Sequence, residues 1–137
     1  MIGILIVAHG AFGEALIHSA SHALGKRPLR VRQVGISMHD DPDAMLPQAR
    51  DLVAQLDDGS GVLVLTDIYG ATPCNLVGKL IDPGHVEAVA GVNLPMLVRA
   101  FTYRAKDMET MVKKAVSGRC EGVLHLEADP RYAAARG

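Results

Sequence analysis

Two apolar runs dominate the hydrophobic pattern of this chain. Residues 2–8 and residues 62–66 are almost wholly apolar and rich in β-branched side chains. The first run stops at His9 and the second at Asp67. Continuous apolar runs of this length are typical of strands that are buried on both faces of a parallel sheet. We therefore predict that these two strands lie at the centre of a sheet.

Stretches of helical spacing separate the predicted strands. The first helix has an apolar stripe that opens at Phe12, and Gly25 with Pro28 ends it. The second ends near residue 56 and begins either at Pro42 or near residue 45, because Pro47 interrupts a regular helix.

Further elements follow from the same signals. We predict a third helix over residues 72–80 with Thr72 as its N-cap, because Pro73 suits the first helical position. Two more helices are predicted over residues 93–104 and 107–117. The remaining strands are predicted over residues 29–36, 86–90 and 122–127.

The alternation of strands and helices predicts an α/β fold. We expect a doubly wound, mainly parallel sheet in the order 2-1-3-4, with helices on both faces and the last strand as an antiparallel edge strand. Residues 1–128 form one domain in this interpretation, and residues 129–137 form a short tail. Open α/β sheets bind ligands at the carboxyl ends of the strands, where the strand order switches. His9 and Asp67 are therefore predicted to be neighbours in a site.

Composition and charge exclude several classes of function. The chain has 14 basic and 15 acidic residues and no polybasic run, so we expect no nucleic-acid partner. No apolar run is long enough to span a membrane and no signal peptide is recognisable, so we expect a cytoplasmic protein without membrane insertion. Cys74 and Cys120 are expected to be reduced. The cysteines have no metal-ligand spacing, and His18 and His22, one turn apart on the first predicted helix, have no third ligand, so we expect neither a metal nor a cofactor.

The predicted pair suggests nucleophilic chemistry at a histidine. A carboxylate that accepts the proton of one ring nitrogen fixes the tautomer of the imidazole. Asp67 can do this for His9, and the other ring nitrogen is then left as a nucleophile.

Phosphate is the ligand that the neighbouring residues suit. Helix N-termini offer backbone N–H groups and a favourable dipole to an anion. One predicted helix starts just after Gly10 and another at Thr72. Gly70 and Ala71 would let the backbone approach closely, and the Thr72 hydroxyl would add a donor. His39 would lie at the same edge of the sheet. We therefore hypothesise that His9 is phosphorylated on one ring nitrogen.

Three segments in this order and spacing carry a resemblance to a known family. They are VAHG around His9, GVLVLTDIYGATPCN at residues 61–75 and AGVNLPML at residues 90–97. The chain closely resembles, over residues 2–127, the IIA domain of the mannose class of the bacterial phosphoenolpyruvate-dependent sugar phosphotransferase system. One departure is the segment at residues 37–40, where the family usually has a glycine-rich loop.

The resemblance implies a mechanism and partners. His9 would be phosphorylated on Nε2, and Asp67 would orient it through Nδ1. The phosphoryl group would come from the phosphocarrier protein HPr and pass to a IIB component, which is expected to be a separate protein. The resemblance also implies a homodimer in which the strand at residues 122–127 crosses to the partner.

Other functions stay open at this point. A phosphocarrier subunit of a phosphoenolpyruvate-dependent dihydroxyacetone kinase would use His9 in the same way with another acceptor. A small class II tetrapyrrole metal chelatase also begins with a buried strand that ends in His-Gly, and it would need a second metal ligand facing His9. A regulatory module phosphorylated only as a signal is a third possibility, which the sequence does not distinguish from sugar uptake.

Overall fold

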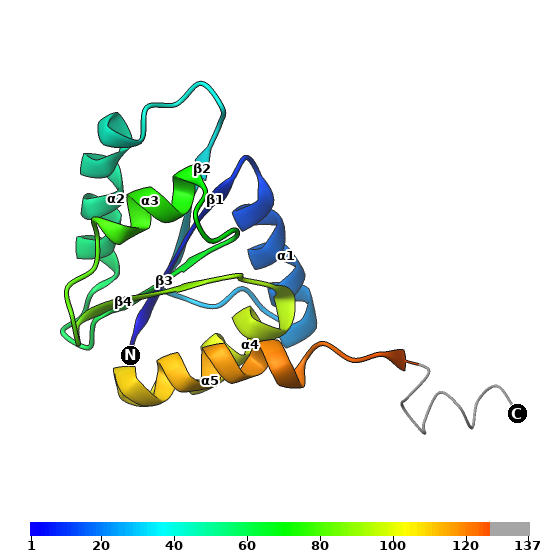
Figure 1. The fold of residues 1–137 in the computed structure, drawn as a ribbon. Coiled ribbons are helices and arrows are strands. Elements are labelled where there is room, and N and C mark those ends of the chain that lie inside the picture. The colour runs from blue at the N-terminus through cyan, green and yellow to red at the C-terminus, as the bar shows by residue number, and fades with distance from the viewer. Residues whose placement is uncertain (127–137) are drawn as a thin grey trace, which may run out of the picture.

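Four parallel strands form the sheet in the computed structural model, which describes residues 1–126 without the side chains of residues 118–121. The strands are β1 (Gly3–His9), β2 (Val31–Ile36), β3 (Val62–Thr66) and β4 (Val86–Ala90). Their order is β2-β1-β3-β4, as predicted (Figure 1). The two central strands are the two apolar runs, because only they must be buried on both faces: all five residues of β3 are buried.

Helices cover both faces of the sheet (Figure 1). One face carries α1 (Phe12–Leu24), α4 (Leu94–Tyr103) and α5 (Met108–Glu121). The other carries α2 (Pro42–Leu56) and α3 (Thr72–Gly78). Alternation along β1 divides the core between the two faces: Ile4 and Ile6 pack on the α1 side, and Leu5 and Val7 pack on the α2 side.

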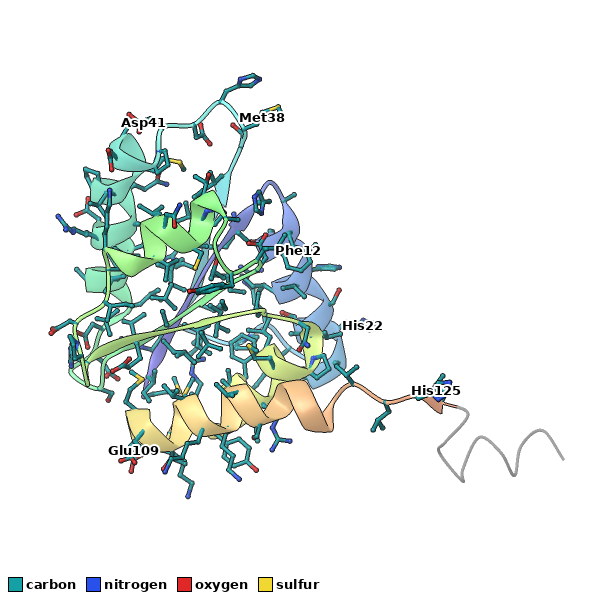
Figure 2. All side chains as sticks on the ribbon, viewed as in Figure 1. Phe12, His22, Met38, Asp41, Glu109 and His125 are labelled. Atoms are coloured by element: carbon teal, nitrogen blue, oxygen red, sulfur yellow. The ribbon has the colours of Figure 1, made fainter. Side chains whose placement is uncertain are left out.

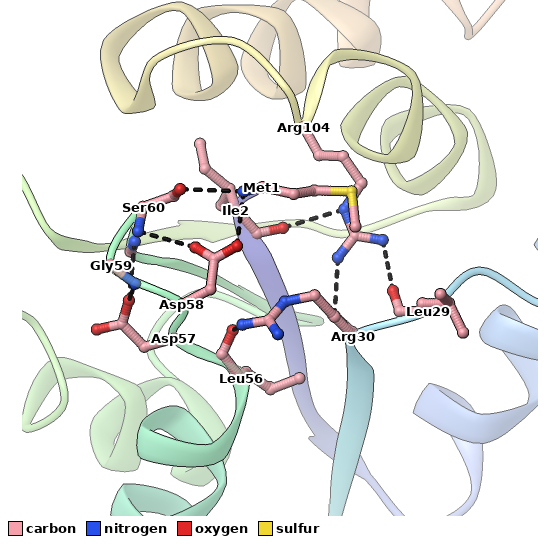
Figure 3. A network of polar contacts seen from close by, with 11 residues as sticks. Met1, Ile2, Leu29, Arg30, Leu56, Asp57, Asp58, Gly59, Ser60 and Arg104 are labelled. Carbon is pink, nitrogen blue, oxygen red and sulfur yellow. Dashed lines mark hydrogen bonds and ion pairs between the residues drawn. The ribbon is translucent and has the colours of Figure 1, made fainter.

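A polar network holds the amino ends of the strands (Figure 3). The guanidinium of Arg104, which is only 6% exposed, donates to the carbonyl oxygens of Ile2, Leu29 and Arg30. Burial, and then the charge of Arg30, lowers the pKa of Arg104 to about 10. Three carbonyl acceptors satisfy this buried cation, so it ties β1, β2 and the end of α4 together.

A histidine–aspartate pair lies at the amino end of β4. Asp57, the residue that ends α2, pairs with the ring of His85, which precedes β4. Its other carboxylate oxygen accepts from the N–H groups of Gly59 and Gly61. Hydrogen bonding to His85, and then to Gly59, lowers the pKa of Asp57 despite its partial burial. The pair joins the loop before β3 to the loop before β4, at the end of the sheet opposite to His9 and Asp67.

The structure decides between the two predicted starts of α2, and it differs from the prediction at two other helix ends. Helix α2 begins at Pro42 and contains Pro47, with the Asp41 side chain as its N-cap. Ala71, not Thr72, is the N-cap residue of α3. Helix α5 continues past the predicted stop at residue 117 to Glu121, because Gly118 lowers helix stability by only about 1 kcal/mol and does not by itself end a helix.

The predicted antiparallel strand does not form within residues 122–126. This segment follows α5 and leads away from the sheet, so the edge of β4 stays without a fifth strand there (Figure 1). Within one copy of the chain, residues 122–126 lie away from the open edge of β4 and form no strand pairing with it. Residue 127, the domain boundary at residue 128 and the predicted tail lie outside the described residues, as does the Cys120 side chain. Cys74 is a free thiol.

None of the helices in the described part of the chain is long and apolar enough to cross a bilayer.

Candidate functional site

His9 and Asp67 meet at the carboxyl edge of the sheet. The ring Nδ1 of His9 lies 2.7 Å from Oδ2 of Asp67, and the backbone N–H of His9 donates to the same oxygen at 2.9 Å. The other oxygen of Asp67 accepts from the N–H of Ile68 at 2.9 Å. The predicted contact is therefore present. The backbone bond, which was not predicted, holds the two strand ends together independently of the ring.

The protonation of the pair follows from its hydrogen bonds. Burial by itself would raise the pKa of Asp67, but hydrogen bonds from the backbone and ring of His9 and from the N–H of Ile68 outweigh it and hold the pKa below its ordinary value. Asp67 is thus a carboxylate near neutral pH, and only Nδ1 can supply the proton between the two groups. This assigns the neutral ring to the Nδ1–H tautomer and leaves a lone pair on Nε2.

The His9 ring is open to solvent beside an apolar cleft. Its side chain is 50% exposed, whereas that of Asp67 is 11% exposed. The cleft has a volume of about 480 Å³ and is lined by His9, Phe12, Asp67, Ile68 and Val92. A nucleophilic nitrogen therefore lies at an accessible surface, and its orienting carboxylate is largely shielded from water.

The helix starts beside the pair differ from the others in their capping. A side-chain oxygen of Asp41, Asn93 or Asp107 accepts an N–H group in the first turn of α2, α4 and α5, respectively. The N-cap residues of α1 and α3 are Ala11 and Ala71, and neither helix has a side-chain cap. The first N–H groups of a helix need an acceptor. The two helices that begin next to His9 and Asp67 are thus the two left open to an external anion.

The predicted phosphate-binding residues all lie at this edge. Gly10 follows His9 with a φ of 52°, and its N–H donates to the Ile36 carbonyl. Gly70, with a φ of 83°, and Ala71 are on the loop between β3 and α3, and Thr72 is the first residue of α3. These four residues do not line the cleft itself.

The sequence did not reveal the apolar wall of the site. Phe12 belongs to the predicted helix stripe but is 41% exposed and faces the cleft, because it is the first residue of α1. Ile68 follows Asp67 and is 60% exposed. The sequence signal that could have indicated this wall is the position of Ile68, an apolar residue directly after the polar residue that ends a buried strand. His39 lies exposed on the β2–α2 loop, away from the residues that line the cleft.

A family model described as the PTS system fructose IIA component, EIIA-man, matches residues 3–117. The chain belongs to this family. Its members are IIA components of the sugar phosphotransferase system, and the predicted membership is confirmed.

In the described residues, no group of three or more His, Cys, Asp or Glu side chains is arranged to hold a metal ion.

Known relatives agree with this assignment. The mannose-specific EIIAB component of Escherichia coli K12 is 34% identical over 132 residues, which is 94% of this chain and 41% of that protein. The chain thus spans about two fifths of the length of that relative. The fructose-specific EIIA component of Bacillus subtilis is 28% identical over 105 residues, covering 76% of this chain and 71% of the relative.

Solved structures show the same architecture. The EIIA component of Streptococcus agalactiae superposes with a TM-score of 0.83 at 26% identity, covering 94% of this chain and all of the other. A mannose/sorbose-specific IIA subunit from Enterococcus faecalis has a TM-score of 0.80 at 19% identity, with 90% and 93% covered. The second likeness supports the fold alone.

Proposed function

We propose that this chain is a phosphohistidine carrier that accepts a phosphoryl group from phospho-HPr on His9 and passes it to a IIB component. The observation that carries the proposal is the His9 Nδ1 contact with Asp67, which leaves Nε2 unprotonated and exposed. The Nε2 lone pair attacks phosphorus as the bond from phosphorus to the donor nitrogen breaks, and the donor keeps that electron pair. The reverse attack by the acceptor restores His9.

The surroundings of His9 suit temporary storage of phosphate. We assign Gly10, Gly70, Ala71 and Thr72 to phosphate binding, because they adjoin the two helix starts without side-chain caps. The chain segments at this edge, residues 9–14, 36–43, 67–75 and 91–95, contain no lysine or arginine. Backbone donors without a fixed cation can hold a phosphoryl group and still release it. A donor or acceptor protein would bring the missing positive charge with it.

The face around His9 has the composition of a docking surface. Phe12, Met38, Ile68 and Tyr69 are large apolar side chains of this edge, and Met38 and Tyr69 are 91% and 85% exposed. Figure 2 shows Met38 on the loop above the sheet and Phe12 beside the first turn of α1. Large apolar groups exposed at the same edge as a reactive side chain are typical of protein–protein contact sites. Such a face suits carriers that are themselves proteins.

The test is a phosphotransfer assay with enzyme I, HPr and labelled phosphoenolpyruvate. We expect acid-labile, base-stable label on the wild type and none on His9→Gln. His85→Gln is the matched control, because His85 also pairs with an aspartate but lies at the other end of the sheet. Equal labelling of His9→Gln and wild type would refute the assignment. The labelled wild type is then mixed with each candidate acceptor. Transfer of the label to a dihydroxyacetone kinase subunit, but not to a IIB component, would favour the kinase phosphocarrier.

We also propose a homodimer formed by exchange of residues 122–127. Val123, Leu124 and Leu126 are more than half exposed, and a groove of about 280 Å³ follows the edge of β4. A strand from a second copy would fill the groove and pair with β4. Light scattering should give a dimer for the full chain and a monomer after truncation at Glu121. A monomeric full chain would refute this arrangement. A carrier charged from phosphoenolpyruvate works in the cytoplasm, where we place it.

A further inference from the structure

Two buried polar atoms without hydrogen-bond partners lie behind the His9 site. Three such side-chain atoms occur in the described residues: Nε of Arg30, Oε1 of Gln33 and Oγ1 of Thr66. Arg30 belongs to the network at the amino ends of the strands (Figure 3). Thr66 ends β3 at the other edge of the sheet, and Gln33 lies in the middle of β2, where it neighbours Ile6 of β1. Because buried polar groups are rarely left unpaired, each of these two needs a physical reason.

Thr66 lies on the α3 side of the site. It is the last residue of β3, directly before Asp67, and it is 1% exposed. Val62 and Val64 pack in the core on the α2 and α3 side, so strand alternation directs Thr66 to the same face. Its carbonyl accepts from the N–H groups of Gly91 and Val92, but its hydroxyl has no partner. The loop that starts at Asp67 leads from here to the uncapped start of α3.

Gln33 lies on the α1 side of the site. It neighbours β1 at Ile6, and its side chain fills the space beside two glycines. A Cβ atom on Gly13, in the first turn of α1, would come within 3.3 Å of the Gln33 Oε1, and one on Gly35 within 3.7 Å. The unpaired oxygen is therefore close behind the second uncapped helix start. The two unpaired atoms thus lie on opposite faces of the sheet: that of Gln33 is close to the start of α1, and that of Thr66 is on the face that carries α3.

We propose that Gln33 and Thr66 are positioning residues for the phosphorylated state, and that their buried polar atoms gain partners when the two helix starts close on the phosphoryl group. This inference rests on the proposed phosphocarrier function. In the unphosphorylated chain the two groups destabilise the fold, because each is removed from water without a hydrogen bond. If phosphorylation satisfies them, the same groups stabilise the phosphorylated form relative to the unphosphorylated one. They act through the helix starts, without contact to the phosphoryl group.

The decisive variants are apolar residues of similar shape, Thr66→Val and Gln33→Met. Both should raise the urea midpoint of the unphosphorylated protein, because they remove an unpaired group. Both should slow phosphorylation from phospho-HPr by roughly three- to tenfold, the rate equivalent of one neutral hydrogen bond. Thr66→Ser keeps the hydroxyl and should therefore retain most of the wild-type phosphorylation rate. A purely structural role would not change stability and rate in opposite directions.

Thr102→Val is the matched control. The hydroxyl of Thr102 donates to the Val98 carbonyl at 2.9 Å on α4, so its removal should neither raise the midpoint nor slow the reaction. A second measurement compares the urea midpoints of phosphorylated and unphosphorylated protein, in the cold and at alkaline pH. Phosphorylation should raise the midpoint more in the wild type than in Thr66→Val.

The outcomes separate this inference from the proposed function. Absence of label on the wild type would refute both. Normal labelling of the wild type together with wild-type rates in Thr66→Val and Gln33→Met would refute the inference alone. A lowered urea midpoint in the two variants would also overturn it, because the hydroxyl and the amide would then have partners in the unphosphorylated protein.

Discussion

Asp67→Asn isolates what the carboxylate does for His9. The substitution keeps the shape of the side chain but replaces one acceptor oxygen with an NH₂ group. Oδ2 of Asp67 accepts two hydrogen bonds from His9, and Oδ1 accepts one from Ile68. The amide has one oxygen for these two positions. If that oxygen faces His9, the NH₂ group opposes the N–H of Ile68, and in the other orientation it opposes both donors of His9.

The expected magnitude follows from these contacts. Attack by Nε2 puts positive charge on the ring, and a carboxylate 2.7 Å from Nδ1 stabilises that charge, whereas a neutral amide does not. Hydrogen bonds to charged groups contribute about 1.5–3 kcal/mol and neutral ones about 0.5–1.5 kcal/mol. Loss of the charged contact therefore costs about 1–2 kcal/mol in the transition state. This corresponds to a rate roughly 5- to 30-fold lower.

The rate of phosphotransfer from phospho-HPr, followed by quenching samples at a series of times, measures this effect directly. The maximal rate should fall while the HPr concentration for half-maximal rate changes little, because Asp67 is largely shielded from a docking protein. Asp57→Asn is the matched control: it alters the pair with His85 and should lower stability without slowing phosphotransfer. Phosphorylation of Asp67→Asn at the wild-type rate would refute the role of the carboxylate. Equal slowing of both variants would point to general destabilisation instead.

Three further predictions concern the frame of the site. Gly35→Ala should lower the unfolding free energy by about 1–3 kcal/mol and should also lower the labelling rate, because the new Cβ would lie 2.2 Å from the Gly10 carbonyl oxygen. Denaturant unfolding measures the first effect, and the phosphotransfer assay measures the second. Asn93→Ala removes the cap that Met96 N–H donates to and should cost about 1 kcal/mol in urea unfolding, with the fold unchanged by circular dichroism. The lowered pKa of Asp67 stabilises the fold at pH values above the ordinary aspartate pKa, and this stabilisation is lost as pH falls through the lowered pKa. The unfolding free energy should therefore fall less steeply with acidification in Asp67→Asn than in the wild type. Equal pH dependence of the unfolding free energy in the two proteins would contradict the assignment.

The sequence was sufficient for the order of the four parallel strands and for the central pair. Burial on both faces of two strands leaves little choice of order, because the runs at residues 2–8 and 62–66 must be central. Parallel βαβ connections then bring the strand ends at His9 and Asp67 to one edge. These features depend on the apolar runs and on the alternation of strands and helices, which do not change with the exact packing of side chains.

Tertiary structure alone decided the finer features of the site. The second bond from the His9 backbone to Asp67, the capping of α3 at Ala71 and the exposure of Phe12 depend on the angles at which strands and helices meet. The unpaired hydroxyl of Thr66 depends on which atoms surround it in three dimensions. Hydrophobic periodicity fixes which face of an element is buried, whereas hydrogen bonds between distant segments require distances that no local pattern contains. The segment at residues 122–126 shows the same limit: its alternating pattern predicts a strand, but whether a strand meets a sheet edge depends on where the chain leads after α5.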